Sequence, residues 1–366
     1  MSDTDRRFMA LALSLASRGV GNVWPNPAVG CVIVNEGRIV GRGWTQPGGR
    51  PHAERRALDQ AGAAARGGTA YVTLEPCAHF GKTPPCAAGL IEAGIARVVS
   101  AFEDPDPRVC GQGHAMLRAA GVTVDVGMMA VEARALQAGF LSRITLGRPW
   151  LALKLATSFD GRIALANGES QWITSAGARS RVHALRARFD AVLVGGGTAR
   201  ADDPLLTVRN FRPLVQPVRV VASARLDLPR GRLAASVDVA QLWVLHGPDV
   251  VSEARNWWRD LGAELIEVPL HDDGIDTAAA LQALGARGLT RVFCEGGGEF
   301  GAALMRAGVV DELIGFTAGV VLGGDARAAV GPLAFNHLPQ APRYDLQEVQ
   351  VIGGDVLHRW RRHSQA

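Results

Sequence analysis

A histidine, a glutamate and two cysteines in the N-terminal third are residue types that can bind a metal ion and move protons. His52 and Glu54 lie in the sequence PHAE, where a helix is expected to begin, and Cys77 and Cys86 follow. One imidazole and two thiolates leave the fourth position of a tetrahedral Zn²⁺ site open for water. Zn²⁺ lowers the pKa of such a water from about 15.7 to about 7. Glu54 is then free to carry a proton from the water to a departing amine.

This pattern predicts one catalytic Zn²⁺ per chain in a deaminase of an aminopyrimidine-type ring. Zinc deaminases of nucleobases carry His-x-Glu followed by two cysteines that are two residues apart. The cysteines here are instead separated by the eight residues Ala78 to Pro85. A structural zinc site is the alternative interpretation. Such a site is expected to have four protein ligands, and Glu54 would then have no role.

Two glycine clusters in the C-terminal half indicate nucleotide binding. Gly195-Gly196-Gly197 and Gly296-Gly297-Gly298 each follow an apolar, strand-like run, and the second cluster opens a helix at Glu299. Glycines at such turns let backbone N–H groups approach phosphates at a helix N-terminus. Neither cluster has the strict G-x-G-x-x-G pattern of a Rossmann fold, and tight turns without a ligand are the alternative.

The chain contains only two lysines, Lys82 and Lys154, against 37 arginines. An ammonium is a compact point charge that a planar guanidinium does not imitate, so the two lysines are candidate functional residues, with chance as the alternative. Lys154 lies in an otherwise apolar strand, where burial without a partner is costly. A role at a sugar or cofactor is therefore favoured over a lysine that reaches out from the strand end.

Two α/β domains, residues 1–145 and 146–366, are expected to position these residues, with a connector at 144–149. Strands are expected in the first domain at 28–34, 38–44, 69–74, 97–102 and 122–126. In the second domain they are expected at 150–157, 191–195, 218–224, 241–246, 264–268, 291–295 and 312–318, followed by a hairpin at 344–361 around Gly353-Gly354.

Charge and hydropathy exclude several classes of partner. Residues 1–145 carry 15 basic and 12 acidic side chains and the remainder 24 and 23, too balanced to predict a nucleic-acid partner but compatible with a small anionic substrate. No apolar run is long enough for a membrane span. Asp3 and Asp5 precede the apolar run at 8–16, which favours an amphipathic helix over a signal peptide. We therefore expect a cytoplasmic protein whose five cysteines are thiols or metal ligands.

The run TLEPCAHFGKTPPC, with PHAE before it and PNPAVGCVIV near the N-terminus, resembles the bifunctional deaminase/reductase family of bacterial riboflavin biosynthesis. In the C-terminal half, WLALKLATSFDGRIA, GESQWITS, GGGTARADDPLLTVR and FCEGGGEFGAAL resemble the reductase part of the same family. The resemblance covers nearly the whole chain. It implies an α/β fold class: a cytidine-deaminase-like three-layer domain followed by a dihydrofolate-reductase-like domain that uses NADPH.

For the first domain, the resemblance implies that His52, Cys77 and Cys86 bind the zinc and that Glu54 is the proton shuttle. It also implies substrate contacts from Asn26, His79 and Lys82, with Lys82 directed to a phosphate. Asn26 could instead serve only the turn, and His79 could be a solvated loop residue. Trp24 and Thr45 stand where the family usually has histidines, a departure that concerns substrate contact and leaves the metal chemistry intact.

For the second domain, the resemblance implies one set of residues for the substrate and one for the cofactor. Arg186 could instead be a solvated helix residue, Trp172 a core residue and Asp202 part of a turn. Lys154, Asp202 or Glu295 could position or protonate the sugar, and the sequence does not rank them. The implied substrate contacts are Ser170, Arg186, Leu206, Arg209 and Glu295, and the implied cofactor contacts are Ala156, Trp172, Thr198, Asp202, Ser223, Gly297, Gly298, Glu299, Phe300, Gly301, Ala302 and Ala303.

Two successive reactions on one phosphorylated pyrimidine are implied. The first is hydrolytic deamination of 2,5-diamino-6-(5-phosphoribosylamino)pyrimidin-4(3H)-one. In the second, NADPH reduces the ribosyl side chain to give 5-amino-6-(5-phosphoribitylamino)uracil. The alternative is a deaminase of another nucleotide or of a nucleic-acid base, joined to a non-catalytic nucleotide-binding domain. The resemblance is also compatible with a homodimer.

Overall fold

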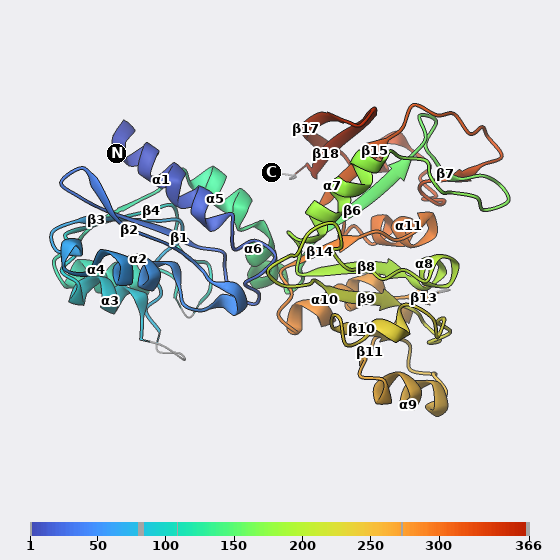
Figure 1. Cartoon of the computed structure of the whole chain (residues 1–366), viewed down its shortest axis with the longest axis horizontal. Coiled ribbons are helices and arrows are strands. Elements are labelled where there is room, and N and C mark those ends of the chain that lie inside the picture. The colour runs from blue at the N-terminus through green and yellow to red at the C-terminus, as the bar shows by residue number, and fades with distance from the viewer. Residues whose placement is uncertain (1, 80–83, 108, 272–273, 364–366) are drawn as a thin grey trace. The chain divides into compact units, whose positions relative to one another are not determined.

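The computed structural model describes the chain except for residues 1, 80–83, 108, 272–273 and 364–366. It divides into two compact units, Met1–Gly147 and Arg148–Ala366 (Figure 1). Residues 144–146, which were expected in the connector, instead form the last turn of helix α6 (Ala138–Leu146). This helix ends at Gly147, which takes the left-handed conformation (φ 69°) that glycine adopts without strain.

Unit 1 is a five-stranded sheet in the order β2-β1-β3-β4-β5, with helices on both faces. Strand β1 pairs antiparallel with β2 and β3, whereas β3, β4 and β5 are parallel. Figure 1 shows α1 and α5 on one face and α2, α3 and α4 on the other. The elements are α1 (Asp3–Ala16), β1 (Gly30–Asn35), β2 (Arg38–Trp44), η1 (Pro47–Gly49), α2 (Ala53–Ala61), η2 (Gly62–Ala65), β3 (Thr69–Val72), α3 (Cys86–Glu92), β4 (Arg97–Ser100), α4 (Gln112–Ala119), β5 (Thr123–Val126), α5 (Ala130–Leu136) and α6.

Two glycines on strand β2 allow helix α2 to approach the sheet closely. A Cβ atom on Gly43 would overlap the carbonyl oxygen of Ala53, and one on Gly41 would overlap that of Ala57. Helix backbone therefore rests directly on strand backbone, without side chains between them. The contact at Ala53 fixes the first turn of α2, where two of the predicted site residues lie.

Unit 2 is a nine-stranded mixed sheet in the order β11-β10-β9-β8-β14-β6-β15-β18-β17. The strands from β11 to β15 are parallel, and β18 and β17 continue the sheet antiparallel. The elements are β6 (Trp150–Thr157), β7 (Arg162–Ala164), α7 (Ala176–Arg186), β8 (Ala191–Gly195), α8 (Gly196–Asp202), β9 (Val218–Ala222), η3 (Ala234–Ser236), β10 (Leu242–His246), α9 (Ser252–Asp260), β11 (Glu264–Glu267), β12 (Leu270–His271), β13 (Gly274–Ile275), α10 (Thr277–Ala286), β14 (Arg291–Cys294), α11 (Gly298–Arg306), β15 (Glu312–Thr317), β16 (Arg327–Ala328), η4 (Leu338–Gln340), β17 (Tyr344–Ile352) and β18 (Asp355–Arg362).

All the strands expected from the sequence are present, and β17 and β18 form the expected hairpin around Gly353 and Gly354. Strands β7, β12, β13 and β16 were not predicted, because runs of two or three residues carry no measurable periodicity. Within the part of the chain that the structure describes, none of the helices combines the length and apolarity that a membrane crossing requires.

The neighbouring parallel strands β6, β8 and β14 end at the same edge of the sheet. Helix α8 begins directly after β8, and α11 begins a few residues after β14 (Figure 1). Ligands of open α/β sheets bind outside the carboxyl ends of the strands. The second group of predicted site residues lies at this edge.

We expect Gly43→Ala to destabilise unit 1 by about 1–3 kcal/mol, because the added methyl group forces α2 away from β2. Gly89→Ala is the matched control: Gly89 lies inside α3, and its new methyl group would be 3.6 Å from Leu58 Cδ1, an ordinary contact. The control should be neutral or stabilised by up to about 1 kcal/mol. Urea unfolding of the full chain measures both, and a Gly43→Ala protein as stable as the wild type would contradict the close approach.

Candidate active sites

Three ligand-type side chains converge in unit 1 from two helix N-termini and one loop. His52 is the N-cap residue of α2, Cys86 is the first residue of α3, and Cys77 lies in the loop that follows β3. His52 Nδ1 lies 3.3 Å from Cys86 Sγ and 3.7 Å from Cys77 Sγ. Their three ligand atoms all lie within 4.8 Å of one another.

These distances suit a tetrahedral zinc site. Zn–S and Zn–N bonds of about 2.3 and 2.0 Å place sulfur and nitrogen about 3.5 Å apart at the tetrahedral angle. No fourth His, Cys, Asp or Glu among the described residues joins this group. The donor set therefore fits Zn²⁺ with one coordination position left over.

Glu54 lies in the first turn of α2 and is only 3% exposed. Burial, together with the charge of the Cys77 sulfur, raises the pKa of its carboxyl to about 6. Hydrogen bonding from the Cys86 thiol lowers the pKa of Cys77 to about 4, and the same bond with burial raises the pKa of Cys86. The backbone N–H of Cys86 also donates to Cys77 Sγ over 3.4 Å. The pocket thus favours one thiolate beside a carboxyl group that gains and loses a proton easily.

The other predicted residues of unit 1 differ in how the structure places them relative to the three ligand side chains. Asn26 packs against Gly49, three residues before His52, where a Cβ atom on the glycine would overlap its amide. His79 is half-buried, and its Nδ1 has no hydrogen-bond partner among the described residues. Lys82 lies outside the described residues. Thr45 is buried, and its hydroxyl accepts a 2.9 Å hydrogen bond from the Val29 N–H, which shows a contact to the protein's own backbone.

Two buried polar residues near this site were missed from the sequence. Gln137 holds Ala28, close to Asn26, with hydrogen bonds to both its N–H and its carbonyl. Glu75 accepts hydrogen bonds from backbone N–H groups further along the chain. The position of Glu75 beside Cys77 is a signal that could have identified it. Nothing in the sequence connects Gln137 with Ala28, 109 residues away.

In unit 2, Lys154, Arg186 and Glu295 form a charged cluster, in which Arg186 is buried and the other two residues are half-buried. Arg186 Nε lies 2.5 Å from Glu295 Oε1, and Lys154 Nζ lies 3.9 Å from Glu295 Oε2. Arg186 also donates to the carbonyl of Thr207 over 2.8 Å. Arg186 is 8% exposed, so it is not the solvated helix residue that the sequence left as an alternative.

The electrostatics of this cluster distinguish its members. Burial lowers the pKa of the Lys154 ammonium, although the Glu295 charge opposes the effect. Burial also raises the pKa of the Glu295 carboxyl, but the charges of Arg186 and Lys154 outweigh it and hold that pKa below its ordinary value. The cluster therefore keeps Glu295 ionised and makes Lys154 more ready to release a proton.

The other predicted substrate residues of unit 2 are Leu206, Arg209 and Ser170, and Asp202 is predicted to be a cofactor contact or a catalytic residue. Leu206 is buried and has a positive φ of 55°, one residue before Thr207, whose carbonyl binds Arg186. Arg209 is exposed overall, and partial removal of its guanidinium from water, together with the charge of Arg186, lowers the pKa of that group. Asp202 ends helix α8, and Ser170 is half-buried.

The structure brings the two glycine clusters together. Thr198 Oγ1 accepts a 3.0 Å hydrogen bond from the N–H of Gly297, which joins the first turn of α8, directly after β8, to the turn after β14. A Cβ atom on Gly196 would lie 3.2 Å from Ser223 Cβ, and the ring of Phe300 fills the space beside Gly195. Thr198, Ser223 and Gly297 therefore lie at one edge of the sheet.

The other predicted cofactor residues differ in exposure. Trp172 is 67% exposed and stacks on the Arg179 guanidinium at 4.3 Å, so it is not a core residue. Gly301 and Ala302 are buried in the face of α11 that packs on the sheet. Gly298 opens α11, Glu299 is exposed, and Ala156 on β6 and Ala303 on α11 are half-buried.

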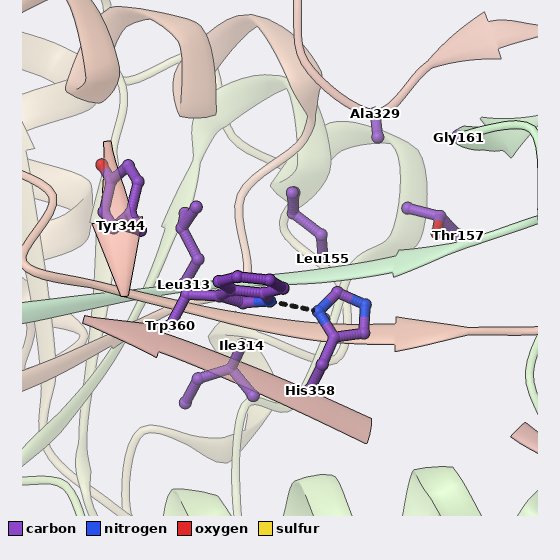
Figure 2. A pocket seen from close by; sticks show the side chains of 10 residues that line it. Leu155, Thr157, Gly161, Leu313, Ile314, Ala329, Tyr344, His358 and Trp360 are labelled. Atoms are coloured by element: carbon purple, nitrogen blue, oxygen red, sulfur yellow. Dashed lines mark hydrogen bonds between the residues drawn. The ribbon is translucent and has the colours of Figure 1, made fainter. Parts of the chain in front are cut away.

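A cavity of about 400 Å³ lies on the other face of strand β6. Figure 2 shows Leu155, Leu313, His358 and Trp360 around it, with Trp360 Nε1 donating to His358 Nδ1 over 2.8 Å. Because successive side chains on a strand point to opposite faces, Lys154 and Leu155 point away from each other. The cavity is therefore separate from the charged cluster.

Comparison with known proteins assigns both units to families. Residues 2–102 match the cytidine and deoxycytidylate deaminase zinc-binding region, and residues 149–358 match the RibD C-terminal domain. The chain is 42% identical over 368 residues to the riboflavin biosynthesis protein RibD of Escherichia coli (strain K12), covering 97% of this chain and 98% of that protein. It is 37% identical to the Aquifex aeolicus protein of the same name, covering 99% of each.

Solved structures of RibD proteins also match nearly the whole chain. Acinetobacter baumannii RibD matches with a TM-score of 0.89 at 37% identity, covering 99% of both chains. A Thermotoga maritima protein described as a diaminohydroxyphosphoribosylaminopyrimidine deaminase/5-amino-6-(5-phosphoribosylamino)uracil reductase matches with a TM-score of 0.85 at 32% identity, covering 98% of this chain and 99% of that one. These matches confirm the fold class expected from the sequence. With both units matched over nearly their full length, the chain belongs to the RibD family of riboflavin biosynthesis proteins.

Proposed function

We propose that unit 1 deaminates a phosphorylated diaminopyrimidine and that unit 2 then reduces its sugar with NADPH. The observation that carries this proposal is the convergence of His52, Cys77 and Cys86 beside the buried carboxyl of Glu54. The alternative, a deaminase with a non-catalytic second domain, is not favoured, because the RibD relatives match both units. Thiols that bind zinc must stay reduced, which supports a cytoplasmic location.

In unit 1, His52, Cys77 and Cys86 would hold one zinc ion. When bound, this ion supplies a water whose pKa is close to neutral. Glu54 accepts a proton from the water that adds to C2 of the pyrimidine ring and delivers it to the amino group there. The C2–N bond then breaks and ammonia leaves. A carboxyl pKa of about 6 suits a group that must both take and return a proton near neutral pH.

Substrate binding in unit 1 is assigned to the loops around this pocket. Asn26 would hydrogen-bond the pyrimidine, since it packs against Gly49 close to His52. His79 Nδ1 is buried and has no hydrogen-bond partner among the residues that the structure describes, so it is a donor or acceptor that could serve the substrate. Lys82 would bind the phosphate as a point charge.

In unit 2, the joined glycine turns would bind the NADPH phosphates with backbone N–H groups at the start of α11. The nicotinamide transfers hydride to C1′ of the sugar, and one proton completes the reduction to the ribityl chain. Glu295 is held ionised, so we assign the proton to Lys154 instead and give Glu295 the role of orienting it. Arg186 donates hydrogen bonds from Nε to Glu295 and from Nη1 to the Thr207 carbonyl, so we assign it the role of holding the site together. We assign the phosphate to the other arginine, Arg209.

Glu54→Gln should lower the rate of ammonia release by at least about 10²-fold, because an amide cannot transfer the proton. Bound zinc should stay at one ion per chain, measured by elemental analysis, since the three ligands are untouched. Reduction of the deaminated product in the same preparation is the internal control and should proceed at the wild-type rate. Full ammonia release in this variant would exclude Glu54 as the shuttle.

Removal of zinc with a chelator should abolish ammonia release and leave NADPH oxidation on the deaminated product intact. The reason is that the three ligand side chains belong to unit 1 alone. Adding Zn²⁺ back should restore deamination. Loss of both activities, or of neither, would contradict the assignment of the metal to the first reaction.

Lys154→Met should lower kcat for reduction by about 10²-fold or more, because methionine fills similar space without a proton to give. NADPH binding, followed by fluorescence, and deamination should both persist. Asp202→Asn serves as the comparison variant and should lower kcat less than Lys154→Met. A reversed order would assign the proton to Asp202.

A further inference from the structure

Glu75 is a buried carboxylate, two residues before Cys77 and 3% exposed. Among the described residues, the His114 imidazole lies beside Glu75, but its Nδ1 is 3.9 Å from Glu75 Oε2, beyond hydrogen-bond distance. Backbone groups satisfy the carboxylate instead. Oε2 accepts from the N–H of Asp104 (3.1 Å) and Gly111 (3.0 Å), and Oε1 accepts from that of Gly113 (2.8 Å) and His114 (3.2 Å).

This surrounding is built for a negative charge. Only an ionised carboxylate accepts hydrogen bonds on both oxygens without placing a proton of its own against an N–H donor. Glu75, Glu103 and His114 also have ligand atoms within 4.8 Å of one another, an arrangement that could suggest a second metal site. The N–H dipoles around Glu75 already saturate its oxygens and oppose a cation there. A structural role for the carboxylate is the consistent explanation.

The Glu75 carboxylate connects the residues that donate hydrogen bonds to it to the loop that carries Cys77. The N–H of Glu75 donates to the carbonyl of Phe102 over 3.1 Å. Gly113 lies so close to Pro76 that a Cβ atom would overlap the proline carbonyl oxygen. Residues 102, 104, 111, 113 and 114 thus hold the loop before Cys77 in place.

Cys77 is held on its other side by helix α3. Its carbonyl accepts from the N–H of Ala87 over 3.2 Å, and its sulfur accepts from the N–H of Cys86 over 3.4 Å. The direction of the Cys77 side chain is therefore fixed by contacts from α3 and by whatever anchors residues 75 and 76.

We propose that Glu75 is a positioning residue for the zinc site, which it serves by fixing the backbone that directs Cys77 Sγ toward His52 and Cys86. The proposal rests on the proposed function of unit 1, because it assumes that these three residues hold zinc. Glu75 does not touch the metal or the substrate. It acts through Pro76 and Cys77, so its loss should appear first in metal affinity.

Glu75→Gln removes the charge and turns one acceptor into a donor that faces N–H groups. Asp5→Asn is the matched control, because Asp5 is also 3% exposed in unit 1 and accepts hydrogen bonds from Tyr71 and Arg97. Zinc affinity of the full chain is measured by competition with a chromogenic chelator, below the unfolding temperature of each metal-free variant. Glu75→Gln should bind zinc at least about tenfold more weakly than wild type. Asp5→Asn should lose thermal stability and keep its affinity within about twofold.

The outcomes separate the two proposals. Equal affinities in wild type and Glu75→Gln, each with one zinc, would overturn the positioning role alone. Wild-type protein that binds no zinc would overturn both. A tenfold loss in Asp5→Asn as well would mean that general destabilisation explains the effect, and would also overturn the positioning role. If Glu75→Gln does not fold, Glu75→Asp decides, since it keeps the charge with a shorter reach: unchanged affinity contradicts the role, and weakened affinity supports it.

Discussion

The deaminase unit depends on the meeting of two helix N-termini beside the sheet. Helix α2 presents His52 at its N-cap, and helix α3 presents Cys86 at its first residue. The first N–H groups of a helix have no partner within it and carry partial positive charge, which favours a nearby anion. One of them, the N–H of Cys86, donates to the Cys77 sulfur. Backbone geometry thus stabilises the thiolate that a metal needs.

The glycines of strand β2 explain how α2 reaches this position. Side chains usually separate a helix from the sheet on which it packs, whereas Gly41 and Gly43 let the two backbones touch. His52 and Glu54 then start from a fixed point on the sheet. Glu54 is consequently buried, and its raised pKa follows from where the helix begins. The glycines of β2 therefore determine where α2 begins, and the start of α2 buries Glu54 and so raises the pKa of its carboxyl.

In unit 2, the order of the parallel strands brings the candidate site residues together. Strands β8 and β14 are far apart in sequence yet adjacent in the sheet, so the turns that follow them meet. The hydrogen bond between Thr198 and Gly297 joins these turns without using the N–H groups at the start of α11. Lys154 on β6 and Glu295 after β14 face each other for the same reason. The sheet order, and not any local motif, creates this site.

Periodicity was enough to predict the long strands, and motif spacing was enough to predict that His52, Cys77 and Cys86 converge. Each of these features depends on nearby residues or on a repeated pattern. Short strands such as β12 and β13 were not predictable, since two residues show no period. The end of α6 was misplaced because Ile144 and Thr145 are weak helix formers that the helix nevertheless includes. Gln137 was missed because its partner, Ala28, is distant in sequence, and its role exists only in the folded chain.

Both units hold a carboxylate near their candidate site, Glu75 buried and Glu295 half-buried, but they balance its charge differently. Glu295 is balanced by the mobile charges of two side chains, Lys154 and Arg186, whereas Glu75 is balanced by fixed backbone dipoles. A side-chain cation can lose its proton or change its contact during a reaction, so the Glu295 cluster suits a site where charge moves. Backbone N–H groups can do neither. The environment of Glu75 therefore suits a carboxylate whose task is to hold one geometry through every turnover.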